Sequence, residues 1–237
     1  MTRVLLEVCV DDAAGLRAAV EGGADRIELC SALSLGGLTP TAGLMQLAGR
    51  MPVPAYAMIR PRAGDFIFGD TEIAMMEAEI DAARQAGLAG VVLGASLADR
   101  CLDAACLARL THRAVHMGRT LHRAFDLVPD QAAALDTAID LGFERILTSG
   151  GEKTAAEGLA AITDLVRRAG SRLSIMPGSG VTLATVGPLL GTGVSEVHAS
   201  CSVTVPTDDR RLVELGFAPE TARRTDAAVV RALKAAL

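Results

Sequence analysis

The stretch VLLEVCVDDAAGLRAAVEGGADRIELCS, residues 4–31, predicts a strand, a helix and a second strand in succession. Residues 4–10 are an apolar run rich in valine, as is typical of a buried strand. The helix follows an aspartate at position 11 or 12, a favoured capping residue, and ends at Gly22 and Gly23. A second short strand covers residues 26–30. This unit predicts two parallel strands joined by a helix.

The same alternation continues through the whole chain. Six further strands are expected at residues 54–61, 90–95, 119–126, 145–150, 172–178 and 194–200. Further helices are expected from residue 39 and at residues 71–86, 103–116, 130–141, 154–169, 182–190 and 226–237. Eight strand–helix units in 237 residues predict an α/β protein with one (β/α)8 TIM-type barrel domain over residues 1–237. The alternative is an open doubly wound sheet, but no GxGxxG turn follows the first strand.

The composition narrows the class of protein. The net charge is −5 and no long basic run is present, so we expect no nucleic-acid partner. No apolar stretch approaches the length of a membrane span, so we expect no membrane partner. The five cysteines include no CxxC pair, which argues against a disulfide framework and against a structural zinc site. These features favour a soluble, cytoplasmic protein.

Two carboxylates and two cysteines occupy strand positions that should be buried. Side chains alternate across a strand, and the wholly apolar face of the first strand should meet the helices. Glu7 and Cys9 therefore point into the barrel, and the same parity turns Glu28 and Cys30 inward on the second strand. The two thiols lie on neighbouring strands at matching ends, where they either pack as small apolar groups or bind a ligand.

Other polar side chains share this inward parity. They are Arg60, His122, Asp126, Glu196, His198 and Ser200. Active sites of barrels lie at the carboxyl ends of the strands, and buried charges need partners. We therefore expect a paired network there, which is either a functional site or a salt-bridged layer that only fixes the strand register. Arg62 and Asp65, in the loop after the third strand, extend the candidate site.

A glycine-rich turn follows the seventh strand. Gly178, Ser179 and Gly180 allow the backbone to approach an anion, and Ser200 after the eighth strand offers a hydroxyl group. Many barrels bind phosphate at these two loops. The turn predicts an anion pocket, although tight turns of this kind require glycine in any case.

Seven motifs resemble those of the CutC family, described as copper homeostasis proteins. In order they are LEVCVD, GGADRIELCS, GGLTP, MIRPRAGDF, HRAFD, RILTSG and IMPGSG. The resemblance runs from residue 5 to about residue 200 and is weaker beyond it. Two positions depart from the usual motifs, since Ser179 replaces a glycine and Leu121 replaces a phenylalanine.

The resemblance implies a cytoplasmic barrel protein that is often a homo-oligomer. It also implies a site for monovalent copper at Cys9 and Cys30, since these cysteines match the two proposed ligand positions. Thiolates are soft ligands that favour Cu(I).

The other matching polar residues favour a second interpretation, because a two-thiol copper site needs none of them. An uncharacterised barrel enzyme of lyase or isomerase type would act on a small anionic or phosphorylated metabolite. His122 or Glu28 would transfer protons, and Arg60 or Arg62 would hold the anion. The candidate catalytic residues are Glu7, Glu28, Arg60, Arg62, Asp65, His122, Asp126 and His198.

The loop RAGDFIFGD, residues 62–70, places Phe66, Ile67 and Phe68 together in a chain with only five phenylalanines. We expect these side chains to be exposed, either as a lid over the barrel mouth or as a subunit contact. The neighbouring Arg62 and Asp65 favour the lid.

Overall fold

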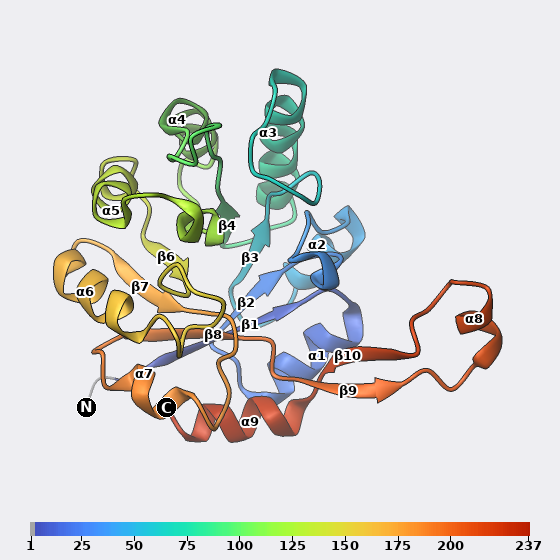
Figure 1. Ribbon diagram of the computed structural model, residues 1–237. Helices are drawn as coiled ribbons and strands as arrows, with labels where there is room; N and C mark the ends of the chain where they lie inside the picture. The colour runs from blue at the N-terminus through green and yellow to red at the C-terminus, as the bar shows by residue number, and fades with distance from the viewer. Residues whose placement is uncertain (1–2) are drawn as a thin grey trace.

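Eight parallel strands form the centre of the protein in the computed structural model, which describes residues 3–237 (Figure 1). They are β1 (Leu5–Val10), β2 (Arg26–Leu29), β3 (Ala55–Met58), β4 (Gly90–Leu93), β5 (Gly118–Leu121), β6 (Arg145–Thr148), β7 (Ser174–Pro177) and β8 (Glu196–Ala199). Strands that follow one another from β1 to β7 are hydrogen-bonded neighbours, and β1 also pairs with β8. This order confirms the predicted α/β barrel and excludes the doubly wound sheet, in which the strand order reverses.

The barrel is nearly closed. Within residues 3–237, no backbone ladder joins β7 to β8, although the two strands lie in contact. Across this seam the hydroxyl oxygens of Ser174 and Ser195 lie 3.3 Å apart. The seam therefore closes through side chains.

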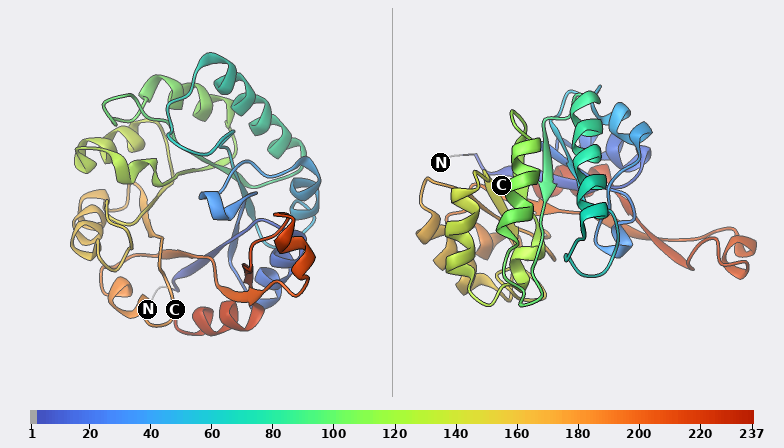
Figure 2. Two further views of the ribbon diagram at one scale, coloured as in Figure 1. Left: turned by 45° about the vertical axis from the view of Figure 1, so that its right-hand side comes forward. Right: turned by 90° about the horizontal axis from the view of Figure 1, so that it is seen from above.

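A ring of helices covers the outside of the strands (Figure 2). They are α1 (Ala13–Gly22), α2 (Ala42–Ala48), α3 (Asp70–Gln85), α4 (Ala104–Arg113), α5 (Gln131–Asp140), α6 (Leu159–Ala169), α7 (Val186–Leu190) and α9 (Ala227–Ala235). Asp12 rather than Asp11 caps α1, because its carboxylate accepts from the amide of Gly15. Among the described residues, no helix is both long and apolar enough to span a membrane.

Strand parity sorts the two faces as expected. Leu6, Val8 and Ile27 are fully buried in the apolar core between strands and helices. Glu7 and Glu28 alternate with them and are also buried, on the interior side. The polar residues of the barrel interior are therefore shielded from bulk water. They need partners within the protein, because an unpaired buried charge is costly.

The segment after β5 differs from the predicted strand. The chain leaves the strand after Leu121 and forms the 3-10 turn η2 (Arg123–Leu127). The ring nitrogen of His122 accepts from the amide of Ala124 and starts this turn. Asp126 therefore does not share a strand face with His122.

The segment between β8 and the last helix, where the sequence predicts no regular element, also contains two strands and a short helix. Strands β9 (Ser202–Pro206) and β10 (Thr221–Thr225) pair as an antiparallel hairpin, with the short helix α8 (Arg210–Glu214) between them. This arm, residues 202–225, projects from the barrel (Figure 2). The β-branched residues of SVTVP are the signal that could have predicted its first strand.

Candidate functional site

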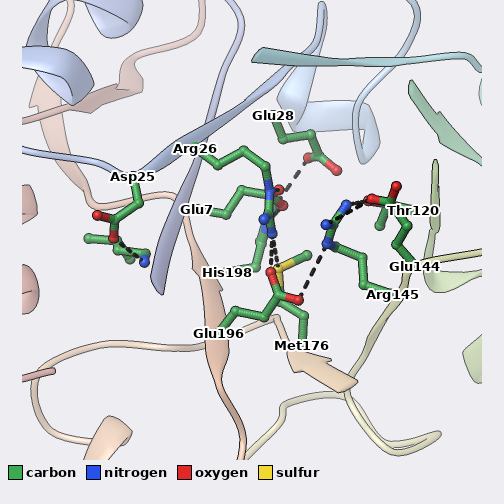
Figure 3. Close-up of polar contacts among 11 residues, drawn as sticks. Glu7, Asp25, Arg26, Glu28, Thr120, Glu144, Arg145, Met176, Glu196 and His198 are labelled. Atoms are coloured by element: carbon green, nitrogen blue, oxygen red, sulfur yellow. Dashed lines mark hydrogen bonds and ion pairs between the residues drawn. The ribbon is translucent and has the colours of Figure 1, made fainter. Parts of the chain in front are cut away.

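A layer of paired charges crosses the barrel interior (Figure 3). The guanidinium of Arg26 bridges the carboxylates of Glu7 and Glu196. Arg145 donates to Glu196 over 3.3 Å. Both guanidinium groups lie over the ring of Tyr56, at 5.3 and 5.0 Å from its centroid. These charges satisfy one another, so the layer leaves few unpaired groups for a ligand.

Glu7 connects this layer to the barrel mouth. Its carboxylate lies 2.8 Å from Nδ1 of His198, and Nε2 of the same ring lies 3.8 Å from Glu28 (Figure 3). Burial disfavours the charged form of Glu7, but Arg26 and His198 outweigh it and lower its pKa to about 2. Burial alone would lower the pKa of His198, but the charge of Glu28 and the contacts with Cys9 and Glu7 outweigh burial and raise this pKa well above its usual value. His198 is therefore an imidazolium at neutral pH.

A cavity of about 280 Å³ opens above this layer, at the carboxyl ends of the strands. Its lining residues are Cys9, Glu28, Leu33, Gly36, Met58, Arg60, Phe66, His122, Arg123, Leu147, Ser179 and His198. Six of them were among the sequence-predicted site residues, namely Cys9, Glu28, Arg60, His122, Ser179 and His198. Strands at opposite ends of the chain therefore converge on one mouth.

The other predicted residues near the mouth have structural partners. Arg62 pairs with Asp65 and Glu72, and its side chain is 39% exposed. Asp126 pairs with Arg123 over 2.6 Å and accepts from the amide of Ser149 over 3.0 Å. These contacts hold the loops after β3 and β5 in place.

The predicted anion turn is only partly at the cavity. Ser179 lines it, whereas Gly178 packs so closely that a Cβ would lie 2.4 Å from Leu147. Gly180 has a φ of 73°, which favours glycine for conformational reasons alone. Ser200 bonds with Ser202 over 3.0 Å at the base of the arm. The role of these four residues in anion binding stays a prediction.

His122 presents a hydrogen-bond donor with no partner. Its Nδ1 accepts from the amide of Ala124 over 3.1 Å, so the proton of the neutral ring lies on Nε2. That Nε2 is buried and has no hydrogen-bond partner among residues 3–237. Burial and the charge of Arg60 lower the pKa of His122 to about 3, so the ring is neutral at physiological pH.

Arg60 is a buried cation without a carboxylate partner. It is 6% exposed and makes no ion pair within the part of the chain that the structure describes. Its guanidinium donates instead to the backbone oxygens of Leu35, Gly37 and Gly64, at 2.9 to 3.2 Å. Burial and the charge of Arg62 lower its pKa, but an arginine stays charged in proteins. The cavity wall thus carries an uncompensated positive charge.

The 62–70 loop places an aromatic ring at the cavity rather than three exposed side chains. The ring centroids of Phe66 and His122 lie 4.8 Å apart. The Cζ atom of Arg60 lies 4.8 Å from the same Phe66 centroid. Phe68 is partly buried against Arg62, and Ile67 alone is well exposed. The placement of Phe66 fits the lid interpretation.

Three side chains at the mouth are spaced as metal ligands. Cys9, Glu28 and His198 bring a sulfur, an oxygen and a nitrogen within 4.8 Å of one another. The register pairs Cys9 with Glu28, and Cys30 lies beyond, its sulfur 3.5 Å from the Glu28 carboxylate. Burial and the charge of Glu28 raise the pKa of Cys30 well above its usual value. Cys30 packs in an apolar cluster with Tyr56 and other side chains.

Arg26, Arg145 and Phe66 are the structurally important residues that the sequence reasoning did not assign to the site. Arg26 and Arg145 open strands β2 and β6, and Arg26 has the same parity as Glu28. Applying the parity test to the preceding inward residue, two positions before Glu28, would have found Arg26. Nothing in the sequence indicates that Phe66 packs against His122.

Fold and site together define an α/β-barrel protein with a cavity at the mouth that is lined by charged and apolar side chains. The CutC family model matches residues 4–203, so the chain belongs to the CutC family.

Relatives match along most of their length. A CutC family protein of Sinorhizobium medicae is 62% identical over 100% of this chain and 97% of its own. One from Caulobacter vibrioides is 52% identical over 98% of this chain and 97% of its own. A solved Streptococcus agalactiae structure, named as a copper homeostasis protein CutC, is 31% identical with a TM-score of 0.80. It covers 83% of this chain and 98% of that chain.

Proposed function

We propose that the mouth cavity binds a small anionic metabolite and that the protein is an enzyme of lyase or isomerase type acting on it. The observation that supports this most strongly is Arg60, a buried cation that faces the cavity without a carboxylate partner. An uncompensated buried charge is costly, and a bound carboxylate or phosphate would remove that cost. The cavity volume of about 280 Å³ suits a small metabolite rather than a polymer.

The remaining polar groups suit proton transfer. Glu28 lies in the same wall, and its Oε1 has no hydrogen-bond partner among residues 3–237. Burial raises the pKa of this carboxyl, which makes it a stronger proton acceptor than a surface glutamate. We assign Glu28 as the proton acceptor and Arg60 as the anion anchor, with Ser179 beside them.

Two arginine variants test the anchor. We expect Arg60→Gln to weaken binding of glycerol 3-phosphate by about 10- to 100-fold, because a charge-assisted hydrogen bond contributes roughly 1.5–3 kcal/mol. The matched control is Arg62→Gln, which removes the same charge next to the cavity from a residue already paired with Asp65 and Glu72. Isothermal titration calorimetry measures both affinities, and unfolding curves check that each variant is folded. Equal losses in the two variants would contradict the assignment.

The second candidate function is Cu(I) binding at the mouth through Cys9 and Cys30. Its support is the cluster of Cys9, Glu28 and His198, with the Cys30 sulfur next to the same carboxylate. The name of the Streptococcus agalactiae relative points the same way. We place it second because Cys9 lines the cavity whereas Cys30 is fully buried with a raised pKa.

Competition with a chromophoric Cu(I) chelator tests this candidate on the reduced protein. We expect Cys9→Ser to weaken Cu(I) binding at least about tenfold, because serine is a poor ligand for a soft cation. Cys30→Ser distinguishes the donor sets, since it weakens a thiol-pair site equally and leaves a site of Cys9 and His198 unchanged. If the parent binds Cu(I) no more tightly than the double variant Cys9→Ser/Cys30→Ser, the copper candidate is eliminated.

We also propose that the protein is a homo-oligomer whose copies meet at the arm, residues 202–225. An isolated two-stranded hairpin is marginally stable in water, and the segment that it carries exposes 52% of Leu215 and 78% of Phe217. A second copy of the chain would cover these side chains. We expect Phe217→Ser to weaken self-association about tenfold or more in sedimentation equilibrium. A monomeric parent at high concentration would refute the proposal.

A cytoplasmic location belongs to the same proposal. All five cysteines are free, and one of them, Cys101, is exposed. Free thiols persist in reducing compartments, which supports the cytoplasm over an oxidising location.

A further inference from the structure

We propose that the metabolite bound at the mouth carries a carbonyl group beside its anionic group, and that Nε2–H of His122 donates a hydrogen bond to the carbonyl oxygen. This inference rests on the proposed function and specifies its substrate class as small anionic carbonyl compounds.

The tautomer of His122 is fixed by the fold. The amide of Ala124 donates to Nδ1 over 3.1 Å, which leaves the proton on Nε2. The same backbone contact begins the turn η2, so the ring cannot exchange its two nitrogens without breaking the turn. The donor therefore always points away from Ala124.

The ring is also packed closely against Gly94 and Phe66. Gly94 packs so closely beneath it that a Cβ at this position would lie 2.0 Å from Cε1 of His122. The ring of Phe66 covers it at a centroid distance of 4.8 Å. A donor held in this way is preorganised, and it needs no rearrangement when negative charge develops on the acceptor.

Among residues 3–237 the donor has no acceptor, which points to a ligand. His122 is 3% exposed and lines the cavity, and leaving a buried N–H unpaired is unfavourable. Arg60 and His122 thus both line one cavity, and each carries a donor group. The cation Arg60 matches a full negative charge, and the neutral His122 matches an oxygen that carries only partial charge. A compound with an anionic group and a carbonyl group satisfies both.

The arrangement favours removal of a proton from the carbon next to the carbonyl. The C–H bond breaks, and its proton moves to the Glu28 carboxylate. The electron pair forms a carbon–carbon double bond, and the carbonyl π pair moves onto oxygen, where Nε2–H stabilises the enolate. Return of the proton to the other face of the same carbon inverts that centre. Where that carbon carries a hydroxyl, its O–H proton moves to the enolate oxygen and the Glu28 proton returns to the former carbonyl carbon, which exchanges the carbonyl and hydroxyl positions. Neither outcome needs an oxidant or a cofactor. Neutral imidazoles polarise substrate carbonyls in this way in known isomerases.

Infrared spectroscopy of bound ligands tests the inference. The probes are dihydroxyacetone phosphate and pyruvate, each labelled with ¹³C at the carbonyl, with the carbonyl-free glycerol 3-phosphate and lactate as matched controls. For at least one probe, we expect the carbonyl band to shift to lower wavenumber on binding. The shift should disappear in His122→Phe, which keeps an aromatic ring between Gly94 and Phe66. The same variant should bind that probe about tenfold more weakly and its control with unchanged affinity.

The outcomes separate the inference from the proposed function. An unshifted carbonyl band, or equal losses for probe and control in His122→Phe, overturns the inference and leaves anion binding at Arg60 intact. If the parent binds none of the four compounds, both the proposed function and the inference are overturned. A shift that persists in His122→Phe assigns the polarisation to another donor and also overturns the inference.

Discussion

Replacing Arg26 by methionine is expected to lower the free energy of unfolding by about 3–5 kcal/mol. Arg26 is 6% exposed and bridges Glu7 and Glu196 inside the barrel. Methionine has a similar volume and no charge, so the variant leaves two buried carboxylates with fewer partners. Such uncompensated charges are far more destabilising than the loss of a surface ion pair.

Urea unfolding followed by circular dichroism measures this effect at pH 7. The matched control is Arg167→Met, which removes an arginine from an exposed ion pair with Asp164 and should change stability by less than about 0.5 kcal/mol. Adding Glu7→Gln to Arg26→Met should restore part of the lost stability, because it removes one of the two stranded charges. A loss below about 1 kcal/mol in Arg26→Met would show that water or a rearranged partner compensates both carboxylates.

Strand parity could be predicted because alternation is a local property of the chain. The inward positions of Glu7, Glu28 and His198 followed from the apolar residues between them. Which inward groups meet depends on the stagger between strands, which the sequence does not reveal. The register sets Cys9 beside Glu28 instead of Cys30. The predicted thiol pair therefore rests on the resemblance and not on the register.

Residues just beyond the strand ends were harder to place. The sequence predicts Arg62 in the loop after the third strand and Asp126 on the inward face at the end of the fifth strand. Their side chains instead complete turns, because loop amides and opposite charges lie nearer than the cavity. Such turns depend on hydrogen bonds between segments that lie far apart in the sequence, as between Asp126 and Ser149. Arg60 and His122, still held by the strand ends, reach the cavity as expected.

The charge state of the mouth could not be predicted from residue types. His122 and His198 are both buried imidazoles, yet their pKa values move in opposite directions. His198 lies against the carboxylates of Glu7 and Glu28, whereas His122 lies near the cation Arg60. Both rings line the same cavity, and only the arrangement of their charged neighbours shows that His122 is the neutral ring and His198 the charged one.

The neutral ring makes stability sensitive to mild acid. The pKa of His122 is about 3 in the folded protein and about 6.5 in the unfolded chain, so between these values the unfolded state binds more protons. The contribution of His122 is fully present above pH 6.5 and is lost as the pH falls. The loss is about 1.4 kcal/mol for each pH unit in the middle of this range, and roughly 4–5 kcal/mol in total.

Urea unfolding of the parent and of His122→Phe at pH 7, 6 and 5 isolates this contribution. Glu28, with its raised pKa, acts in the opposite sense above pH 4.5, and Glu7 acts only below that pH. Both groups are present in the two proteins, so their contributions cancel in the difference between parent and variant. Between pH 7 and pH 5, we expect the free energy of unfolding of the parent to fall by about 2 kcal/mol more than that of His122→Phe. Parallel pH profiles would mean that the ring titrates in the folded protein as it does in the unfolded chain, and His122 would then not be held as a neutral Nε2–H donor below pH 6.5.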